Sequence, residues 1–201
     1  MTSHLSIGTI LLDDATATQD FKSRLYQHPN KVLRAYSLLE AQQVVDEISL
    51  AQKDGDYVVA LLNYELGLAI QNLDYSPNTL LLEAYFYDSV NNLNQEQVEE
   101  YLKHHSNAQP AGLLDIQHGI NQEEFSKAVT QIQELIREGQ TYQVNFTYPI
   151  TGSCYGSPVG LYQKLKRQQP APFGAFILKE TGYVLSFSPE WFIQHEQGKL
   201  C

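Results

Sequence analysis

One carboxylate near the end of the chain is placed where acid–base chemistry is possible. Glu190 follows Pro189 and lies between two apolar segments, Leu185–Phe187 and Trp191–Ile193. If its side chain emerges from a hydrophobic wall, desolvation raises the pKa of the carboxyl group and suits it to general acid catalysis. A single Glu after a proline is also typical of a solvated turn, so the position alone permits both interpretations.

Other common catalytic arrangements are not visible in the sequence. No histidine lies at a metal-ligand spacing from a cysteine or from a second histidine, and the adjacent His104 and His105 would point to different faces of a helix. Ser186 and Ser188 lack the flanking glycines of a nucleophile elbow. A metal cage and a serine hydrolase are therefore disfavoured.

Two pairs of short strands are expected on either side of Glu190. One pair flanks the turn signal Glu180-Thr-Gly182, and the other flanks Glu196-Gln-Gly198. The four expected strands are Phe173–Lys179, Tyr183–Phe187, Trp191–His195 and a segment from Lys199 onward.

The helix from Gln122 to Glu138 has the clearest local signals. Asn121 can cap it, Glu124 can complete a capping box, and Gly139 stops it. The alternating segment that follows predicts a strand from Tyr142 to Ile150. Its polar face is either solvated or a polar binding surface, and it carries Gln143, Asn145, Thr147 and Pro149.

Strand and helix patterns alternate through the rest of the chain. Tyr57–Tyr64 and Leu80–Tyr87 lack polar alternation, which is typical of strands covered on both faces. Polar, loop-forming residues indicate a boundary between two parts near residues 106–120. The other expected elements are strands at Ser6–Leu12 and Lys31–Tyr36, helices at Leu39–Lys53 and Gln95–His105, and a short helix that opens at Gly156-Ser-Pro158 and runs through Leu165. The last helix ends in basic residues that complement its dipole, which we favour over an anion site: Lys164, Lys166 and Arg167.

The composition is that of a globular protein. Apolar residues make up 43% of the 201 residues, charged residues make up 18%, and the formal net charge is -10. That charge argues against a nucleic-acid partner, because binding phosphates requires clustered Lys and Arg. Cys154 and Cys201 give no disulfide framework, and neither a signal peptide nor a membrane span is visible. We expect a cytoplasmic protein with no membrane partner.

Three motifs match one known family in order and in spacing. They are Gly139-Gln-Thr-Tyr-Gln-Val-Asn145, Ala171-Pro-Phe-Gly-Ala-Phe176 and Ser188-Pro-Glu-Trp-Phe192. They resemble the G-D-x-Y-Q-V-N, A-P-F-x-A-F and S-P-E-x-F motifs of the chorismate-utilising enzymes. Asp56–Gly67 is more weakly similar to a further segment of that family. Asn145 favours the aminodeoxychorismate synthase branch, since anthranilate synthases usually carry an apolar residue there, but one position leaves the anthranilate branch open.

The resemblance implies an α+β fold with antiparallel sheets and flanking helices. Residues 1–115 would form an N-terminal region, and residues 116–201 would begin the chorismate-binding catalytic domain. The implied reaction replaces the C4 hydroxyl of chorismate by an amino group. A separate glutaminase subunit supplies the ammonia, and Mg2+ bridges the substrate carboxylate to protein carboxylates.

The resemblance also assigns roles to particular residues. Glu190 falls on the general acid and base of the family, which protonates the departing hydroxyl. Pro172 and Phe173 fall on a pocket that binds tryptophan in some members, and Asp14 stands where those members have Ser. Trp191 replaces the usual Arg of the third motif, which would alter the setting of the acid.

The family's nucleophilic Lys, in its P-I-K-G-T segment, and its Mg2+ ligands would follow Cys201. We therefore expect a truncated, N-terminal portion of such an enzyme that is inactive alone and has a C-terminal half as a possible partner. Three alternatives stay open: an anthranilate synthase component I fragment, a non-catalytic module that binds an amino acid or a protein partner, and a fragment that does not fold stably.

Overall fold

The computed structural model describes residues 5–17, 22–107, 110–196 and 198–200. The larger sheet contains β1 (Ile10–Asp13), β2 (Ser23–Tyr26), β6 (Asn91–Leu93), β9 (Phe173–Lys179) and β10 (Gly182–Ser188). The smaller sheet contains β3 (Lys31–Ala35), β4 (Tyr57–Leu62) and β5 (Leu82–Tyr87). The helices that cover these sheets are α1 (Leu38–Asp54), α2 (Tyr64–Ile70), α3 (Gln95–His105) and α5 (Pro158–Gln168).

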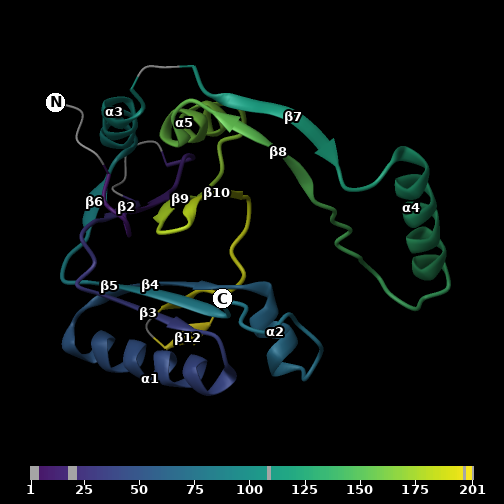
Figure 1. Ribbon diagram of the computed structural model, residues 1–201, viewed down its shortest axis with the longest axis horizontal. Helices are drawn as coiled ribbons and strands as arrows, with labels where there is room; N and C mark the ends of the chain where they lie inside the picture. Colours follow the sequence, from purple (N-terminus) through teal and green to yellow (C-terminus); the bar gives the residue numbers. More distant parts are fainter. Residues whose placement is uncertain (1–4, 18–21, 108–109, 197, 201) are drawn as a thin grey trace.

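The two sheets lie face to face between two layers of helices (Figure 1). The strand orders are β10-β9-β1-β2-β6 and β3-β5-β4, and every pair of neighbours is antiparallel. Helices α1 and α2 cover the outer face of the smaller sheet, while α3 and α5 cover the outer face of the larger one. The expected α+β class with antiparallel sheets and flanking helices is confirmed.

Strand β5 shows how the core is built. It is the central strand of the smaller sheet, and all six of its residues are buried. Because side chains alternate along a strand, Leu82 and Phe86 pack against α1, whereas Tyr85 and Tyr87 pack toward the larger sheet. The prediction that Leu80–Tyr87 forms a strand covered on both faces is confirmed.

The corresponding prediction for Tyr57–Tyr64 is wrong in two respects. Strand β4 ends at Leu62, and Tyr64 begins helix α2. β4 is also an edge strand, so Tyr57 and Leu62 remain 44% and 67% exposed. Its apolar residues made it resemble β5, but only a strand with neighbours on both sides and cover on both faces is fully buried.

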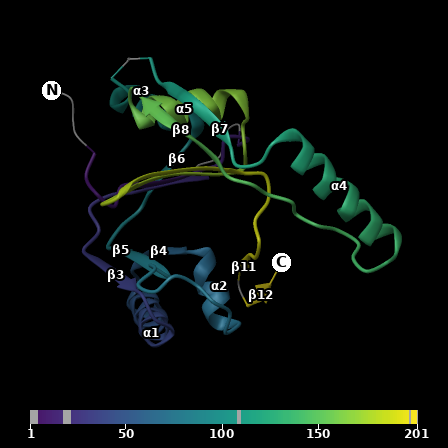
Figure 2. The same ribbon diagram turned by 45° about the vertical axis from the view of Figure 1, so that its right-hand side comes forward.

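An arm extends away from the layers. It contains β7 (Gly112–His118), α4 (Gln122–Arg137) and β8 (Ile150–Tyr155), and β7 pairs with β8 (Figures 1 and 2). Helix α4 has the expected capping box between Asn121 and Glu124. None of its residues is buried, and Phe125 on its apolar face contacts the rings of Phe146 and Tyr148 in the connection to β8.

The predicted strand from Tyr142 to Ile150 is wrong. Strand β8 begins only at Ile150, and the alternating residues 142–149 are not in a strand. A ladder needs a neighbouring strand, and no described strand pairs with this segment. Strand β7, which pairs with β8, was not predicted from the sequence.

The end of the described chain forms a small hairpin of β11 (His195–Glu196) and β12 (Lys199–Leu200). The larger hairpin before it, β9 with β10, is confirmed as expected. Strand β9 also pairs with β1, so residues from both predicted parts share one sheet, and the division at residue 115 stays a prediction. No helix in the described ranges is both long enough and apolar enough to cross a membrane.

Candidate functional site

Glu190 lies in the connection between β10 and β11. The hydroxyl of Ser188 donates a hydrogen bond of 2.6 Å to the main-chain oxygen of Glu190, which fixes the backbone just after β10. The side chain of Glu190 is exposed. The hypothesis of a carboxylate that emerges from a hydrophobic wall is therefore wrong for this structure, and the solvated-turn interpretation describes it. The catalytic role that the resemblance assigns to Glu190 stays a prediction.

Asp14, Pro172 and Phe173 line one pocket, although Asp14 is far from the other two in the sequence. The antiparallel pairing of β1 with β9 brings them together, because Asp13 lies opposite Gly174 at the end of both strands. The pocket has a volume of about 540 Å³. Its floor includes Leu12 and Ala175, which face the smaller sheet, so the pocket opens at one end of the space between the sheets.

Trp191 forms a further wall of this pocket. Its indole ring stacks on the ring of Phe173, with ring centroids 4.8 Å apart and an interplanar angle of 26°. The stack joins the second family-like motif to the third. It also places the residue next to Glu190 against the pocket.

Charged groups of both signs face the same pocket. Asp14 supplies a carboxylate, while Lys22 and Arg24 supply cations. Oδ1 of Asp14 is already used, because it accepts hydrogen bonds from the backbone of Thr16 and Ala17 and from the Thr16 hydroxyl. The arrangement suits a small ligand that carries both an ammonium and a carboxylate group.

A buried polar network that the sequence analysis missed lies directly behind Asp14. Asp13 and Lys166 are 2% and 5% exposed, and Lys166 Nζ lies 2.8 Å from Asp13 Oδ2. Tyr162 donates to the same oxygen at 3.2 Å, and burial followed by the negative charge of Asp13 raises the pKa of Tyr162. Gln95 Nε2 donates both to Asp13 Oδ1, at 3.0 Å, and to the main-chain oxygen of Asp14, at 2.6 Å. The network thus links the pocket backbone to α3 and α5.

The sequence contained one signal for this network. Tyr162 and Lys166 are four residues apart and so lie on one face of α5, and Tyr162 belongs to its apolar face. Lys166 was expected to complement the dipole of that helix at its surface. The structure instead pairs it with a buried carboxylate, while Arg167 does remain exposed and pairs with Glu99 at 3.1 Å.

The first family-like motif does not reach this site. Gly139–Asn145 lies in the connection between α4 and β8, on the arm that extends away from the sheets (Figure 2). Gln143 donates a hydrogen bond to Asn145 at 3.3 Å, and both side chains are exposed. The polar face of this segment is solvated here.

The Mg2+ that the resemblance implies finds no ligand set in the described ranges. No three His, Cys, Asp or Glu side chains there lie close enough together to hold a metal ion. The described residues therefore do not fit a Mg2+ site.

Comparisons with known proteins agree on one family. Residues 8–201 match the family described as chorismate binding enzyme. Aminodeoxychorismate synthase component 1 of Klebsiella aerogenes is 40% identical over 81 residues, which are 40% of this chain and 18% of that protein. The protein of the same name from Escherichia coli (strain K12) is 34% identical over 86 residues, 43% of this chain and 19% of that protein. Anthranilate synthase component 1 of Leptospira biflexa is 24% identical over 136 residues, 67% of this chain and 29% of that protein. The matched stretches thus span less than a third of each relative.

Proposed function

Because the chain belongs to the chorismate binding enzyme family, we propose that it supplies the N-terminal part of an aminodeoxychorismate synthase component 1. Such an enzyme converts chorismate and ammonia to 4-amino-4-deoxychorismate, the precursor of para-aminobenzoate in folate synthesis. A glutaminase subunit provides the ammonia. Three ordered motifs support the family, and this branch is supported by Asn145 together with the relatives from Klebsiella aerogenes and Escherichia coli.

We assign the general acid and base to Glu190. Its exposed carboxylate is accessible to a substrate, and its own main-chain oxygen accepts a hydrogen bond from the Ser188 hydroxyl. A general acid must lie within hydrogen-bond reach of the departing hydroxyl, and its efficiency depends on the environment that encloses it. The observation that carries the proposal is the stack of Phe173 on Trp191, because it joins the A-P-F strand to the S-P-E segment.

We further propose that the 201 residues alone do not turn over chorismate. The described ranges contain no ligand set for Mg2+, and the matched stretches cover only a small share of each relative. Chorismate, Mg2+ and ammonia are added to the purified chain, with and without the remaining portion of the Klebsiella relative. We expect no aminodeoxychorismate from the chain alone and measurable product from the mixture.

The assignment of Glu190 is tested in the same mixture. Glu190→Gln should lower the rate about 100-fold or more, which is the usual contribution of general acid–base catalysis. Glu196→Gln is the matched control, because Glu196 is also an exposed glutamate and lies in the following strand, β11. Equal rates for the two variants would refute the role of Glu190.

Anthranilate synthase is the second candidate. Two relatives of that name match longer stretches of the chain, 67% of it for Leptospira biflexa and 82% for Buchnera aphidicola. The product separates the two candidates, because the anthranilate branch aminates and eliminates pyruvate whereas the aminodeoxychorismate branch retains that side chain. Anthranilate from the mixture would transfer the assignment to that branch.

A third candidate is a non-catalytic role in which the chain binds an amino acid. The pocket of Asp14, Pro172 and Phe173 is also lined by Lys22 and Arg24, two cations that can bind the carboxylate of an amino acid. We expect weak binding of L-tryptophan by calorimetry, because the anionic Asp14 replaces the Ser of tryptophan-binding members. Asp14→Ser should tighten it, and binding that is strong in the unchanged chain would contradict this interpretation.

A further inference from the structure

Side chains, and not a strand ladder, join β1 to β2 at the Asp14 pocket. The pairing of these strands ends where Leu12 lies opposite Arg24. Beyond that point the side chain of Ser23 bridges them. Its hydroxyl donates a hydrogen bond to Asp13 Oδ1 at 3.1 Å and accepts one from the main-chain amide of Asp14, also at 3.1 Å. Ser23 is 1% exposed, so water does not compete for these bonds.

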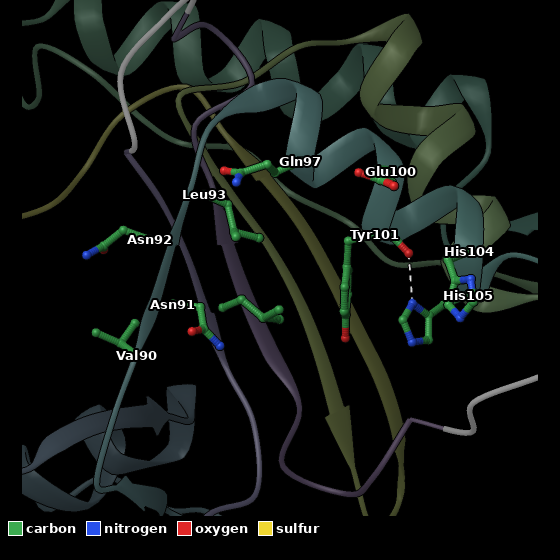
Figure 3. Close-up of a pocket in the computed structure, with 10 residues that line it drawn as sticks. Val90, Asn91, Asn92, Leu93, Gln97, Glu100, Tyr101, His104 and His105 are labelled. Atoms are coloured by element: carbon green, nitrogen blue, oxygen red, sulfur yellow. Dashed lines mark hydrogen bonds between the residues drawn. The ribbon is translucent and has the colours of Figure 1, made fainter.

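Gln95 completes this junction from α3, the helix that follows β6 after a single intervening residue (Figure 3). Its Nε2 donates to Asp13 Oδ1 at 3.0 Å and to the main-chain oxygen of Asp14 at 2.6 Å, and it lies 3.2 Å from Ser23 Oγ. Its Oε1 accepts from Lys166 Nζ at 2.8 Å. Because an ammonium group can only donate, Lys166 fixes which end of the Gln95 amide is the oxygen. The amide therefore has one orientation, and both of its ends are used.

The main chain of Asp14 is thus held at both of its polar groups. Ser23 binds the amide, and Gln95 binds the carbonyl. Lys22 and Arg24, which flank Ser23 in the sequence, line the same pocket as Asp14. A buried polar network whose members are all hydrogen-bonded is rigid. The network therefore fixes the carboxylate of the pocket relative to the strand that carries its cations.

A fixed arrangement of charges distinguishes the two enantiomers of an amino acid. L and D forms carry the same ammonium, carboxylate and side chain, and they differ only in how these groups are placed relative to one another. A preorganised pocket binds the form that matches its geometry more tightly, because it does not have to be ordered when the ligand binds. A pocket whose charged walls moved independently would bind both forms with similar affinity.

We propose that Gln95 and Ser23 are positioning residues that make the Asp14 pocket selective for L-amino acids. The inference rests on the amino-acid-binding role proposed above and adds to it the residues that set the selectivity. Neither Gln95 nor Ser23 lines the pocket. They act through the main chain of Asp14 and through the placement of Arg24 beside it.

The probes are L-tryptophan and D-tryptophan, titrated into the full 201-residue chain while the amide chemical shifts of Asp14 and Arg24 are followed. We expect the unchanged chain to prefer the L form about fivefold, as for one well-placed hydrogen bond. Gln95→Met keeps the length of the side chain but removes its hydrogen bonds, and Ser23→Ala removes the bridge between the strands. Each variant should reduce the preference to about twofold or less. Because both enantiomers are measured on the same variant, a loss of stability affects both titrations equally and leaves their ratio unchanged.

Gln163→Met is the matched control. Gln163 of α5 is also a half-buried glutamine, but its amide donates to Glu99, at 3.2 Å, and not to the pocket backbone. Its substitution should leave the preference for L-tryptophan unchanged. Equal affinity for the two enantiomers in the unchanged chain, or a preference that survives both Gln95→Met and Ser23→Ala, overturns the inference and leaves the amino-acid-binding role standing. A preference that is lost equally in Gln163→Met also overturns it, because any loosening between α3 and α5 would then suffice. If neither enantiomer binds the unchanged chain, the amino-acid-binding role is wrong and the inference is wrong with it.

Discussion

The ammonium group of Lys166 lies 2.8 Å from the carboxylate of Asp13, and both side chains are almost completely buried. Asp13 ends β1, next to the pocket residue Asp14, while Lys166 comes from α5. A residue of the second half of the chain therefore supports the backbone of the first half at the pocket that both halves line.

Removing one partner of this ion pair should lower the free energy of unfolding. Lys166→Met keeps most of the side-chain volume but leaves Asp13 as a buried charge without its cation, which typically costs about 3–5 kcal/mol. We expect the free energy of unfolding, measured by urea titration, to fall by that amount.

The double variant Asp13→Asn with Lys166→Met provides the control. It removes both charges, so it should recover part of the stability lost in Lys166→Met. Arg167→Met changes an exposed neighbour and should cost less than about 1 kcal/mol. If Lys166→Met is no more destabilising than Arg167→Met, the ion pair does not stabilise the fold.

A second buried carboxylate predicts how stability depends on pH. Glu83 of β5 is 2% exposed and contacts Arg34 at 2.7 Å and Lys179 of β9 at 3.0 Å, so it joins the two sheets. Burial alone would raise the pKa of Glu83, but hydrogen bonds from Lys179 and Arg34 outweigh burial and lower it. A carboxyl group with a lowered pKa stabilises the fold above its unfolded pKa, and that contribution is lost as the pH falls through the folded value.

We therefore expect the free energy of unfolding to decrease from neutral pH toward acid, most steeply below the usual glutamate range of about 4.3. Urea titrations at a series of pH values measure this slope. Glu83→Gln should be less stable at pH 7 and should show a shallower decrease with acid than the unchanged chain. Parallel curves for the two proteins would contradict the role given to Glu83.

Local signals in the sequence were sufficient for elements that are stabilised by their own residues. Helix α4 was predicted to within one residue because the capping box of Asn121 and Glu124 and the turn at Gly139 are local. The hairpin of β9 and β10 was also predicted, since its turn residues lie between two apolar runs. The class of fold, in contrast, was expected from the resemblance to the family.

Features that depend on distant partners were not predictable in the same way. Residues 142–149 alternate like a strand, but a strand exists only where another strand pairs with it. The pairing of Lys166 with Asp13 requires β1 and α5 to meet, which no local pattern reveals. The common location of Asp14, Pro172 and Phe173 was expected only through resemblance to a family, and the contact of Trp191 with Phe173 was not expected at all.

The apolar face of α4 predicts association. No residue of α4 is buried, and Phe125 and Ile136 are each 41% exposed. An exposed apolar face of this kind is usually an interaction surface or a cause of aggregation. The 201-residue chain should therefore self-associate with increasing concentration in sedimentation velocity experiments.

Replacing apolar residues of this face should reduce that association without loss of stability. Neither Ile132 nor Ile136 is buried, so Ile132→Gln and Ile136→Gln should change the free energy of unfolding by less than about 0.5 kcal/mol. Leu102→Ala in the core is the contrasting variant and should cost about 2–5 kcal/mol. Unchanged sedimentation of the α4 variants would show that another surface is responsible.

The stack of Trp191 on Phe173 can be followed directly by fluorescence. Trp191 is the single tryptophan of the chain, so its emission reports only on this pocket. Phe173→Leu removes an aromatic contact worth about 0.5–1.5 kcal/mol and should leave the indole, already 52% exposed, in a more aqueous environment. We expect the emission maximum to move to longer wavelength.

Phe125→Leu in the arm is the matched control, because Phe125 packs only with aromatic residues of that arm among the ring contacts described. The stack is contradicted if both variants shift the emission equally or if neither does. A small pocket ligand without an indole, such as L-leucine, should shift the emission of the unchanged chain if the pocket closes around it, and this shift should be smaller in Phe173→Leu.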